Sequence, residues 1–216
     1  MIPIVINNRN RLTTTRKLVE DLKRLGQLNI WIIDNSSTYP PLLEWYNTNP
    51  CTILYEDNLG PYAIYHIPLF RTVNQVIYTD SDIELNPNMP DNFVEIFEQL
   101  SWTYKGIKVG TGLRVDDLPP YPQSENYKNW EAQNWIDQVQ PYIYKGYIDT
   151  TFALINPNIP FSYEGIRICS PNIIARHIPW YLKLEDLDEE NIYYIEHAND
   201  YSTLKRFYNS DIKQNN

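Results

Sequence analysis

The sequence predicts an α/β fold with a mixed, mostly parallel central sheet flanked by helices, in a single domain of 216 residues. Short runs of consecutive apolar residues, such as IPIVI at 2–6 and IWII at 30–33, are typical of strands that are buried on both faces. Helical patterns separate these runs, and strands that alternate with helices indicate parallel β-α-β units. No internal repeat or low-complexity block interrupts the pattern.

The first part of the chain, residues 1–100, alternates regularly. The strand at 2–6 is followed by a helix at 13–26, in which Leu18, Leu22 and Leu25 share one face and Gly26 is a natural stop. Threonines at the start of this helix are suited to cap it. The remaining elements of this part are expected at 30–33 (strand), 41–46 (short helix), 52–55 (strand), 60–70 (helix), 75–80 (strand) and 90–100 (amphipathic helix).

The second part of the chain is less regular. Residues 107–115, 149–155 and 166–168 have the composition of strands, and proline-rich connections lie between them. The stretch 116–140 is either a lid or substrate loop or an irregular connection. We expect residues 101–182 to add strands and loops that cover the sheet within the same domain, with 183–216 as a C-terminal extension.

Composition excludes some classes of function. The net charge is −9 and no Lys/Arg-rich block is present, so binding to nucleic acid or to an anionic membrane is not expected. Two widely spaced cysteines form neither a disulfide framework nor a zinc site, and they fit a reducing, cytoplasmic setting. The first apolar run reaches polar residues after six positions, so we expect no signal peptide and no membrane anchor.

Polar side chains follow each predicted strand of the first part. In open α/β sheets, ligands bind at the carboxyl ends of the strands. The residues at these ends are Asn7, Asn8, Arg9 and Arg11 after the first strand, Asp34 after the second, Asp57, Asn58 and Gly60 after the third, and Asp80 and Asp82 after the fourth. Asn, Asp and Gly are common at any strand end because they form turns. A preference for turn formers does not account as well for Arg9 and Arg11 or for the pair Asp80 and Asp82.

The pair Asp80-Ser81-Asp82 predicts a site for a divalent cation. Residues i and i+2 of an extended segment project to one side, and paired carboxylates suit Mg²⁺ or Mn²⁺, which prefer oxygen ligands. A second Asp-x-Asp at 186–188 lies in a charged run that is typical of a solvated face.

A histidine is the natural candidate for a further metal ligand. His177 is flanked by Arg176, which favours an anion site. His66 lies in an apolar helical pattern and is expected to be packed there, whereas His197 has no evident partner.

These motifs, in this order, resemble the GT-A-fold glycosyltransferases that use nucleotide-sugars. IPIVINNRNRLTTTRKLVEDL, IIDNSST, DNLGP and YTDSDIEL are similar to the Rossmann-like nucleotide-binding half of family 2-like enzymes. GLRVDDLPPY, IDTTFALI and IARHIPWYL are similar to the second half of a subgroup found in bacteria and in large DNA viruses. The resemblance covers residues 2–182 and implies one GT-A catalytic domain, in the host cytoplasm if the source is viral.

The resemblance implies a role for several individual residues. Those that would contact the nucleotide are Asn7, Arg9, Asp34, Asn58 and Asp80, with Asp34 on the base and Asp80 on the ribose. Those that would hold the divalent cation, Mn²⁺ or Mg²⁺, are Asp80, Asp82 and His177.

The general base is implied less directly. Asp149 falls where the inverting enzymes of the family keep this base, but Ile148 stands where the common motif has a second acidic residue. A position at the border of an apolar strand could raise the pKa of Asp149 by desolvation, although the pattern alone favours an ordinary turn carboxylate. Further candidates, for the donor sugar or the acceptor, are Arg114, Asp116, Asp117 and Glu131.

The expected activity is therefore metal-dependent, inverting transfer of a hexose-type sugar. The donor would be a nucleotide-diphosphate sugar, preferably a UDP-sugar, and the acceptor a hydroxyl of a glycan or glycoside. A divalent metal stabilises the departing diphosphate, and a carboxylate takes the acceptor proton. Retaining transfer, synthesis of nucleotide-sugars by a nucleotidyltransferase and non-catalytic carbohydrate binding are the alternatives. The sequence does not indicate an oligomeric state.

Overall fold

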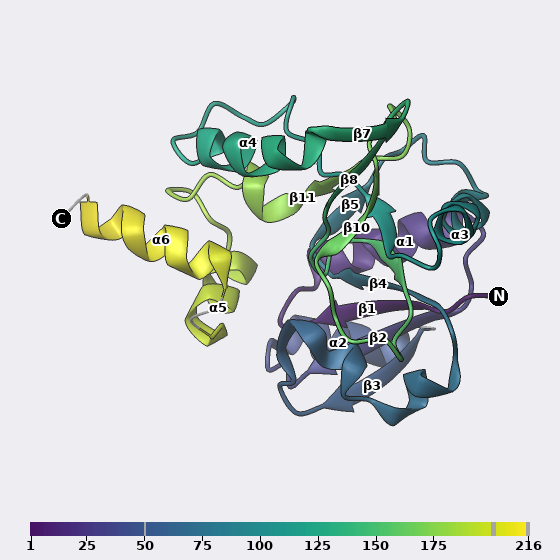
Figure 1. Cartoon of the computed structure of the whole chain (residues 1–216). Coiled ribbons are helices and arrows are strands. Elements are labelled where there is room, and N and C mark those ends of the chain that lie inside the picture. Colours follow the sequence, from purple (N-terminus) through teal and green to yellow (C-terminus); the bar gives the residue numbers. More distant parts are fainter. Residues whose placement is uncertain (50, 200–201, 215–216) are drawn as a thin grey trace.

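Helices flank one large mixed sheet in the computed structural model, which describes residues 1–49, 51–199 and 202–214 (Figure 1). The sheet has nine strands in the order β3-β2-β1-β4-β9-β6-β10-β8-β7. Its strands are β1 (Ile4–Asn8), β2 (Ile30–Asn35), β3 (Thr52–Glu56), β4 (Val76–Asp80), β6 (Val109–Thr111), β7 (Asp137–Gln140), β8 (Ile143–Tyr147), β9 (Ala153–Ile155) and β10 (Glu164–Ile168). A separate two-stranded sheet pairs β5 (Ile83–Leu85) with β11 (Ala175–His177).

The two sides of the large sheet differ in strand direction. β3, β2, β1 and β4 are parallel to one another, as the alternation of strands and helices predicts. On the other side only the pair β6–β10 is parallel, and the remaining four pairings are antiparallel. Only residues 141–142 join β7 to β8, and so short a connection favours antiparallel pairing because parallel strands need a longer crossover. The α/β class is confirmed, but a mostly parallel sheet is not confirmed.

The α-helices in the described residues are α1 (Thr13–Arg24), α2 (Pro40–Thr48), α3 (Phe93–Thr103), α4 (Ser124–Ala132), α5 (Glu189–His197) and α6 (Thr203–Gln214). The short 3₁₀ helices are η1 (Gly60–Tyr65), η2 (Pro68–Thr72), η3 (Gln133–Trp135) and η4 (Ile178–Tyr181). The stretch 60–70, where a helix was expected, contains two short 3₁₀ helices instead, and Pro61 and Pro68 lie in their first turns. The stretch 116–140 is not an irregular connection, since it contains α4, η3 and β7.

Alternating side chains of the strands divide the core into two layers. Ile4 and Ile6 of β1 face α1, α2 and α3, in a cluster that also includes Phe152 and Ile166 from the second part of the chain. Val5 faces the opposite side, where η1 and η2 pack. Because residues 1–100 and 101–182 share one core cluster, they fold as one body.

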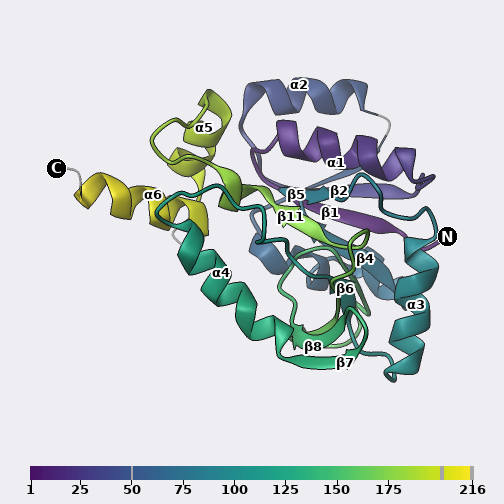
Figure 2. The ribbon, with the colours of Figure 1, turned by 90° about the horizontal axis from the view of Figure 1, so that it is seen from above.

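The C-terminal helices lie at one end of the sheet. Figure 2 shows α1 and α2 on the same side of β1 and β2, with α5 and α6 beyond them and far from the N-terminus. α6 contacts α4 through an edge-to-face pair of Tyr127 and Phe207. No helix within the described ranges is both long and apolar enough to cross a membrane.

Candidate functional site

The strand order reverses between β1 and β4, which makes the edge beside these two strands the candidate position for a ligand. The chain runs outward from β1 through β2 to β3 and then returns to β4, so the direction of winding reverses between β1 and β4. In open α/β sheets this reversal opens a crevice at the carboxyl ends of the two strands. Asn7 of β1 pairs with Asp80 of β4 at that edge. The segments NNRNR and DSD therefore meet there.

The small β5–β11 sheet brings His177 to Asp82. The backbone N–H of Ile178 donates to the Asp82 carbonyl at 2.9 Å, and Nε2 of His177 lies 3.4 Å from Oδ1 of Asp82. Their side chains are only 19% and 16% exposed. Burial alone would raise the pKa of Asp82, but His177 and then Arg11 outweigh this effect and hold the pKa below its usual value.

Asp80 is held by Thr150, beside the same edge. The Thr150 hydroxyl donates to Oδ2 of Asp80 at 2.7 Å, and the Asp80 N–H donates to the Thr150 carbonyl at 2.9 Å. Burial, and then the charge of Asp82, raise the pKa of Asp80 well above its usual value. The site therefore favours a proton or a cation next to this carboxyl group.

The three predicted metal ligands do not form one preassembled set. Within the ranges that the structure describes, no three His, Cys, Asp or Glu side chains are grouped so that they could hold a metal ion. Asp82 and His177 come together, and Asp80 interacts with Asp82 through charge but is not in a common ligand group with them. The expectation of a complete three-residue ligand set is corrected to a pair with a neighbouring carboxyl group.

Arg11 is a further charged residue of this edge. Its side chain is 4% exposed, and its charge acts on Asp82. One guanidinium nitrogen donates to Oδ1 of Asn191, and the guanidinium lies 3.7 Å from the ring centroid of Tyr194. Of the two arginines in NNRNR, the resemblance assigned only Arg9 to the nucleotide. The signal in the sequence for Arg11 was its position, as a second arginine directly after the first strand.

Buried polar atoms without a hydrogen-bond partner gather at this edge. They are Asn8 Oδ1, Arg9 Nε, Asn10 Nδ2, Arg11 Nε and Nη2, Asp82 Oδ1 and His177 Nδ1. Buried polar groups in folded proteins nearly always have a partner. These donors and acceptors are therefore available to a polar ligand, a cation or water.

The other nucleotide candidates after β1 and β3 are tied to neighbouring loops. Nδ2 of Asn7 donates to the Gly60 carbonyl at 3.2 Å. Arg9 donates to the Asn35 carbonyl at 2.6 Å and to the His197 carbonyl at 3.3 Å. Asn58 is exposed, and its side chain accepts the Gly60 N–H at 3.2 Å within its own turn. Asn7 and Arg9 are thus held at the carboxyl end of β1 by the end of β2 and the turn after β3, whereas Asn58 is exposed within its own turn.

Asp34 is engaged inside the protein. It is 1% exposed, and its two oxygens accept the Tyr46 hydroxyl and the Ser37 N–H, both at 2.9 Å. Tyr46 in turn accepts a hydrogen bond from Asn8. The predicted contact between Asp34 and a base is not supported, because both oxygens of this carboxylate are used within the protein. They connect β2 to α2 through Tyr46 and to the turn after β2 through Ser37.

Asp149 directly precedes Thr150 and is exposed, so it is not desolvated and has the surroundings of the ordinary turn carboxylate that the pattern alone favoured. Its backbone carbonyl accepts a hydrogen bond from Nζ of Lys108 at 3.0 Å, and the same ammonium group donates to Ile148 at 2.7 Å and to Ser162 at 3.1 Å. Burial lowers the pKa of Lys108 to about 8, against the opposing charges of Asp149 and Asp80. Lys108, which the sequence did not single out, fixes the backbone at Asp149.

The candidates for the donor sugar or acceptor occupy two other places. Asp117 accepts hydrogen bonds from Arg176 at 3.0 Å and from Tyr181 at 2.7 Å. Arg114 lies 3.2 Å from the exposed Asp116 and 3.9 Å from Asp117. These residues form an ion-pair cluster around η4 and β11.

Glu131 does not face a ligand. It is 1% exposed, pairs with the buried Arg167, and accepts hydrogen bonds from the Leu113 N–H and the Trp135 indole. The prediction that Glu131 binds a sugar is wrong, because its acceptors are used within the core. The nearby tryptophan is a structural partner of the carboxylate.

Comparison with known proteins assigns no relationship. No protein-family model matches the chain, and no curated protein matches it. Its function is therefore inferred from the residues of the site.

Proposed function

We propose that the chain is a metal-dependent glycosyltransferase that moves a hexose-type sugar, with inversion, from a nucleotide-diphosphate sugar to a glycan or glycoside hydroxyl. The observation that carries this proposal is the contact between Asp82 and His177, 3.4 Å apart, beside Asp80 and Arg11 at the β1/β4 crevice. Two carboxyl groups, an imidazole and a buried guanidinium at this position suit a divalent cation with a diphosphate.

The residues present fit a divalent cation that enters with the nucleotide. Mg²⁺ and similar ions are commonly held by one or two carboxylates, with phosphate oxygens and water as the other ligands. Asp82 and His177 would hold the ion, and Asp80 would supply a further oxygen; Oδ1 of Asp82, which faces His177 and accepts no hydrogen bond from the described residues, supports this. When bound, the ion would act as a Lewis acid that stabilises negative charge on the departing diphosphate.

Besides the metal ion, the reaction requires a cation that binds the phosphate oxygens and a base that takes the acceptor proton, and Arg11 and Asp149 would supply these. The buried Arg11 guanidinium has two unpaired nitrogens, Nε and Nη2, that can bind phosphate oxygens. Asp149 is exposed and therefore accessible to an acceptor hydroxyl, whose proton it would take as general base. Lys108 positions Asp149 through its backbone carbonyl. A UDP-sugar is the preferred donor because of the resemblance of the sequence motifs.

Binding of UDP in the presence and absence of Mn²⁺, measured by calorimetry, tests the metal site. We expect Asp82→Asn and His177→Ala to weaken Mn²⁺-dependent binding by at least about tenfold, since each removes a charged or coordinating group worth ~1.4 kcal/mol or more. Asp186→Asn, in the exposed second Asp-x-Asp, is the matched control and should bind as the native chain does. Metal-independent UDP binding that neither site variant alters would contradict the proposal.

Transfer activity then tests the base. Asp149→Asn should retain UDP-sugar binding but lose transfer, because it keeps the shape of the side chain without its basicity. Retained transfer in Asp149→Asn would remove this residue as base and favour a retaining reaction.

A further inference from the structure

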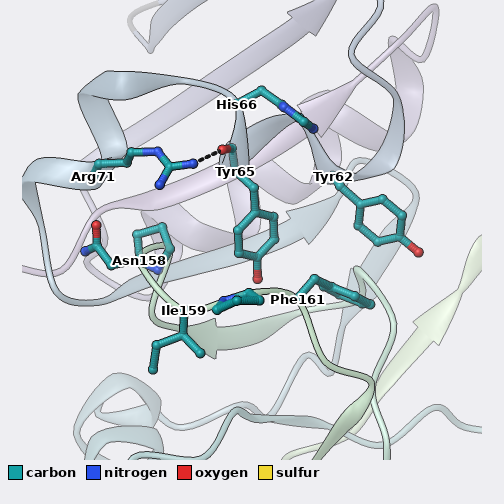
Figure 3. A pocket seen from close by; sticks show the side chains of 9 residues that line it. Tyr62, Tyr65, His66, Arg71, Asn158, Ile159 and Phe161 are labelled. Atoms are coloured by element: carbon teal, nitrogen blue, oxygen red, sulfur yellow. Dashed lines mark hydrogen bonds between the residues drawn. The ribbon is translucent and has the colours of Figure 1, made fainter.

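An aromatic pocket lies on the face of the sheet that η1 and η2 cover (Figure 3). Its volume is about 380 Å³, in the range of small-molecule sites. The residues that line it are Tyr62, Tyr65, His66, Arg71, Pro157, Asn158, Ile159, Pro160 and Phe161. His66 is exposed at this pocket and is not packed in a helix, which corrects the sequence-based expectation.

The aromatic rings of the pocket form a connected wall. The ring centroids of Tyr62 and Phe161 are 4.5 Å apart, and those of Tyr65 and Phe161 are 6.1 Å apart. Figure 3 shows Tyr62 and Tyr65 pointing from η1 toward the 159–161 segment. The Tyr62 hydroxyl is hydrogen-bonded to that of Tyr163 at 2.9 Å. Apolar ring faces beside polar groups suit a ligand with one apolar face and several hydroxyls.

The opposite wall is held in place before any ligand binds. Asn158 donates to the Val73 carbonyl at 2.8 Å and, through its own N–H, to the Asn156 side chain at 2.9 Å. Pro157 and Pro160 restrict the backbone on either side. Arg71, at the edge of the pocket, is held by a 2.7 Å hydrogen bond that it donates to the Tyr65 carbonyl. A preformed wall lowers the entropic cost of binding.

A short chain of contacts connects the pocket to Asp149. Nζ of Lys108 lies 4.3 Å from the ring centroid of Phe161 and 3.0 Å from the Asp149 carbonyl oxygen. The charges of Asp149 and Asp80 also act on the Tyr62 hydroxyl. The pocket does not include Asp82 or His177, so it is separate from the proposed cation and diphosphate site. A ligand in the pocket would therefore lie on the Asp149 side of the crevice.

We propose that this aromatic pocket binds a sugar ring of the acceptor, with the apolar face of a pyranose on Tyr65 and Phe161 and its hydroxyls toward Arg71 and Asn158. None of the nine lining residues is acidic, so the pocket is not suited to a cationic ligand. The acceptor assignment rests on the proposed glycosyltransferase function, whereas sugar binding itself rests on the pocket.

The test is ligand-observed NMR on the full chain without nucleotide or metal, using the methyl glycosides of glucose, galactose and mannose as probes. We expect saturation transfer to at least one glycoside, and binding about tenfold weaker in Tyr65→Ala and in Phe161→Ala, as the loss of a stacked ring predicts. Trp102→Ala, which removes an exposed ring on α3, is the control and should bind as the native chain does.

UDP binding with Mn²⁺ is measured on the same variants, and it separates the two proposals. It should be unchanged in Tyr65→Ala and Phe161→Ala, which also shows that both variants fold. If the glycosides bind but UDP does not, the pocket proposal stands and the nucleotide-sugar function is contradicted. Two results would overturn the pocket proposal: no binding of any glycoside probe to the native chain, or glycoside binding in both pocket variants that is as strong as in the native chain.

Discussion

Lys108 is the residue whose environment gives the clearest pH dependence. Its ammonium group donates to three backbone carbonyls beside Asp149, and burial lowers its pKa to about 8. The unfolded chain would keep a lysine pKa of about 10.4. Between pH 8 and 10.4 the unfolded state therefore binds a proton that the folded state has released, and the free energy of unfolding rises with pH through this window.

We predict that this rise disappears in Lys108→Met. The difference in free energy of unfolding between the native chain and the variant should increase by up to about 1.4 kcal/mol per pH unit across the window, since one proton is involved. Urea unfolding at pH 7, 8, 9 and 10 measures it, and comparison with the variant cancels the titration of the tyrosines. A constant or falling difference would show that Lys108 stays charged in the folded protein.

The distant partners of Asp82 and Glu131 decide which of the sequence-based residue assignments agree with the structure. The resemblance assigned Asp82 and His177 to one site, and the β5–β11 pairing does bring their side chains together. That they hold a metal ion stays a prediction. Glu131 was assigned to a sugar because its partner Arg167 lies far along the chain in an ordinary strand. A carboxylate's local sequence does not reveal which distant cation or donor satisfies it.

At the scale of elements, α1 is capped by α5 and not by its own threonines. No side chain at the N-terminus of α1 caps the helix. Instead the Glu190 carboxylate accepts the N–H groups of Leu12 and Thr13 at 3.0 and 3.1 Å, and the Thr13 hydroxyl at 2.7 Å. A carboxylate at this position also interacts favourably with the helix dipole. The cap therefore joins the C-terminal extension to the first helix.

We predict that Glu190→Ala lowers the free energy of unfolding by about 1–2 kcal/mol, the usual effect of losing an N-terminal cap. Glu189→Ala is the matched control, because Glu189 is the exposed neighbour in the first turn of α5. Urea denaturation of the two variants compares them directly. If both lose the same stability, the contact with α1 contributes little and the effect belongs to α5 alone.

At the scale of the whole molecule, the regular part of the fold was the predictable part. Continuous apolar strands separated by helices indicated β1 to β4 and their parallel order. The antiparallel β7–β8–β10 side was not predicted, because β7 and β8 are mostly polar or half-buried and lack an apolar run. Nor did the sequence indicate that α5 packs against the site, since this depends on contacts over more than 170 residues.

The C-terminal extension positions the site arginines, and this can be tested by removing it. Arg9 donates to the His197 carbonyl, and Arg11 contacts Asn191 and the Tyr194 ring. A chain that ends at Leu182 should therefore melt at a lower temperature and bind UDP with Mn²⁺ about three- to tenfold more weakly, because an arginine without its anchors must be ordered by the ligand.

Two further variants separate this effect from loss of the fold. Tyr194→Leu keeps the full chain but removes the ring over Arg11, and it should weaken UDP binding in the same direction. A chain that ends at Ser210 retains the contacts of α5 and should match the native affinity. Because α5 reaches both the N-terminus of α1 and the crevice between β1 and β4, the extension links helix stability to ligand binding. Native affinity in both the Leu182 truncation and Tyr194→Leu would show instead that the sheet edge alone positions the arginines.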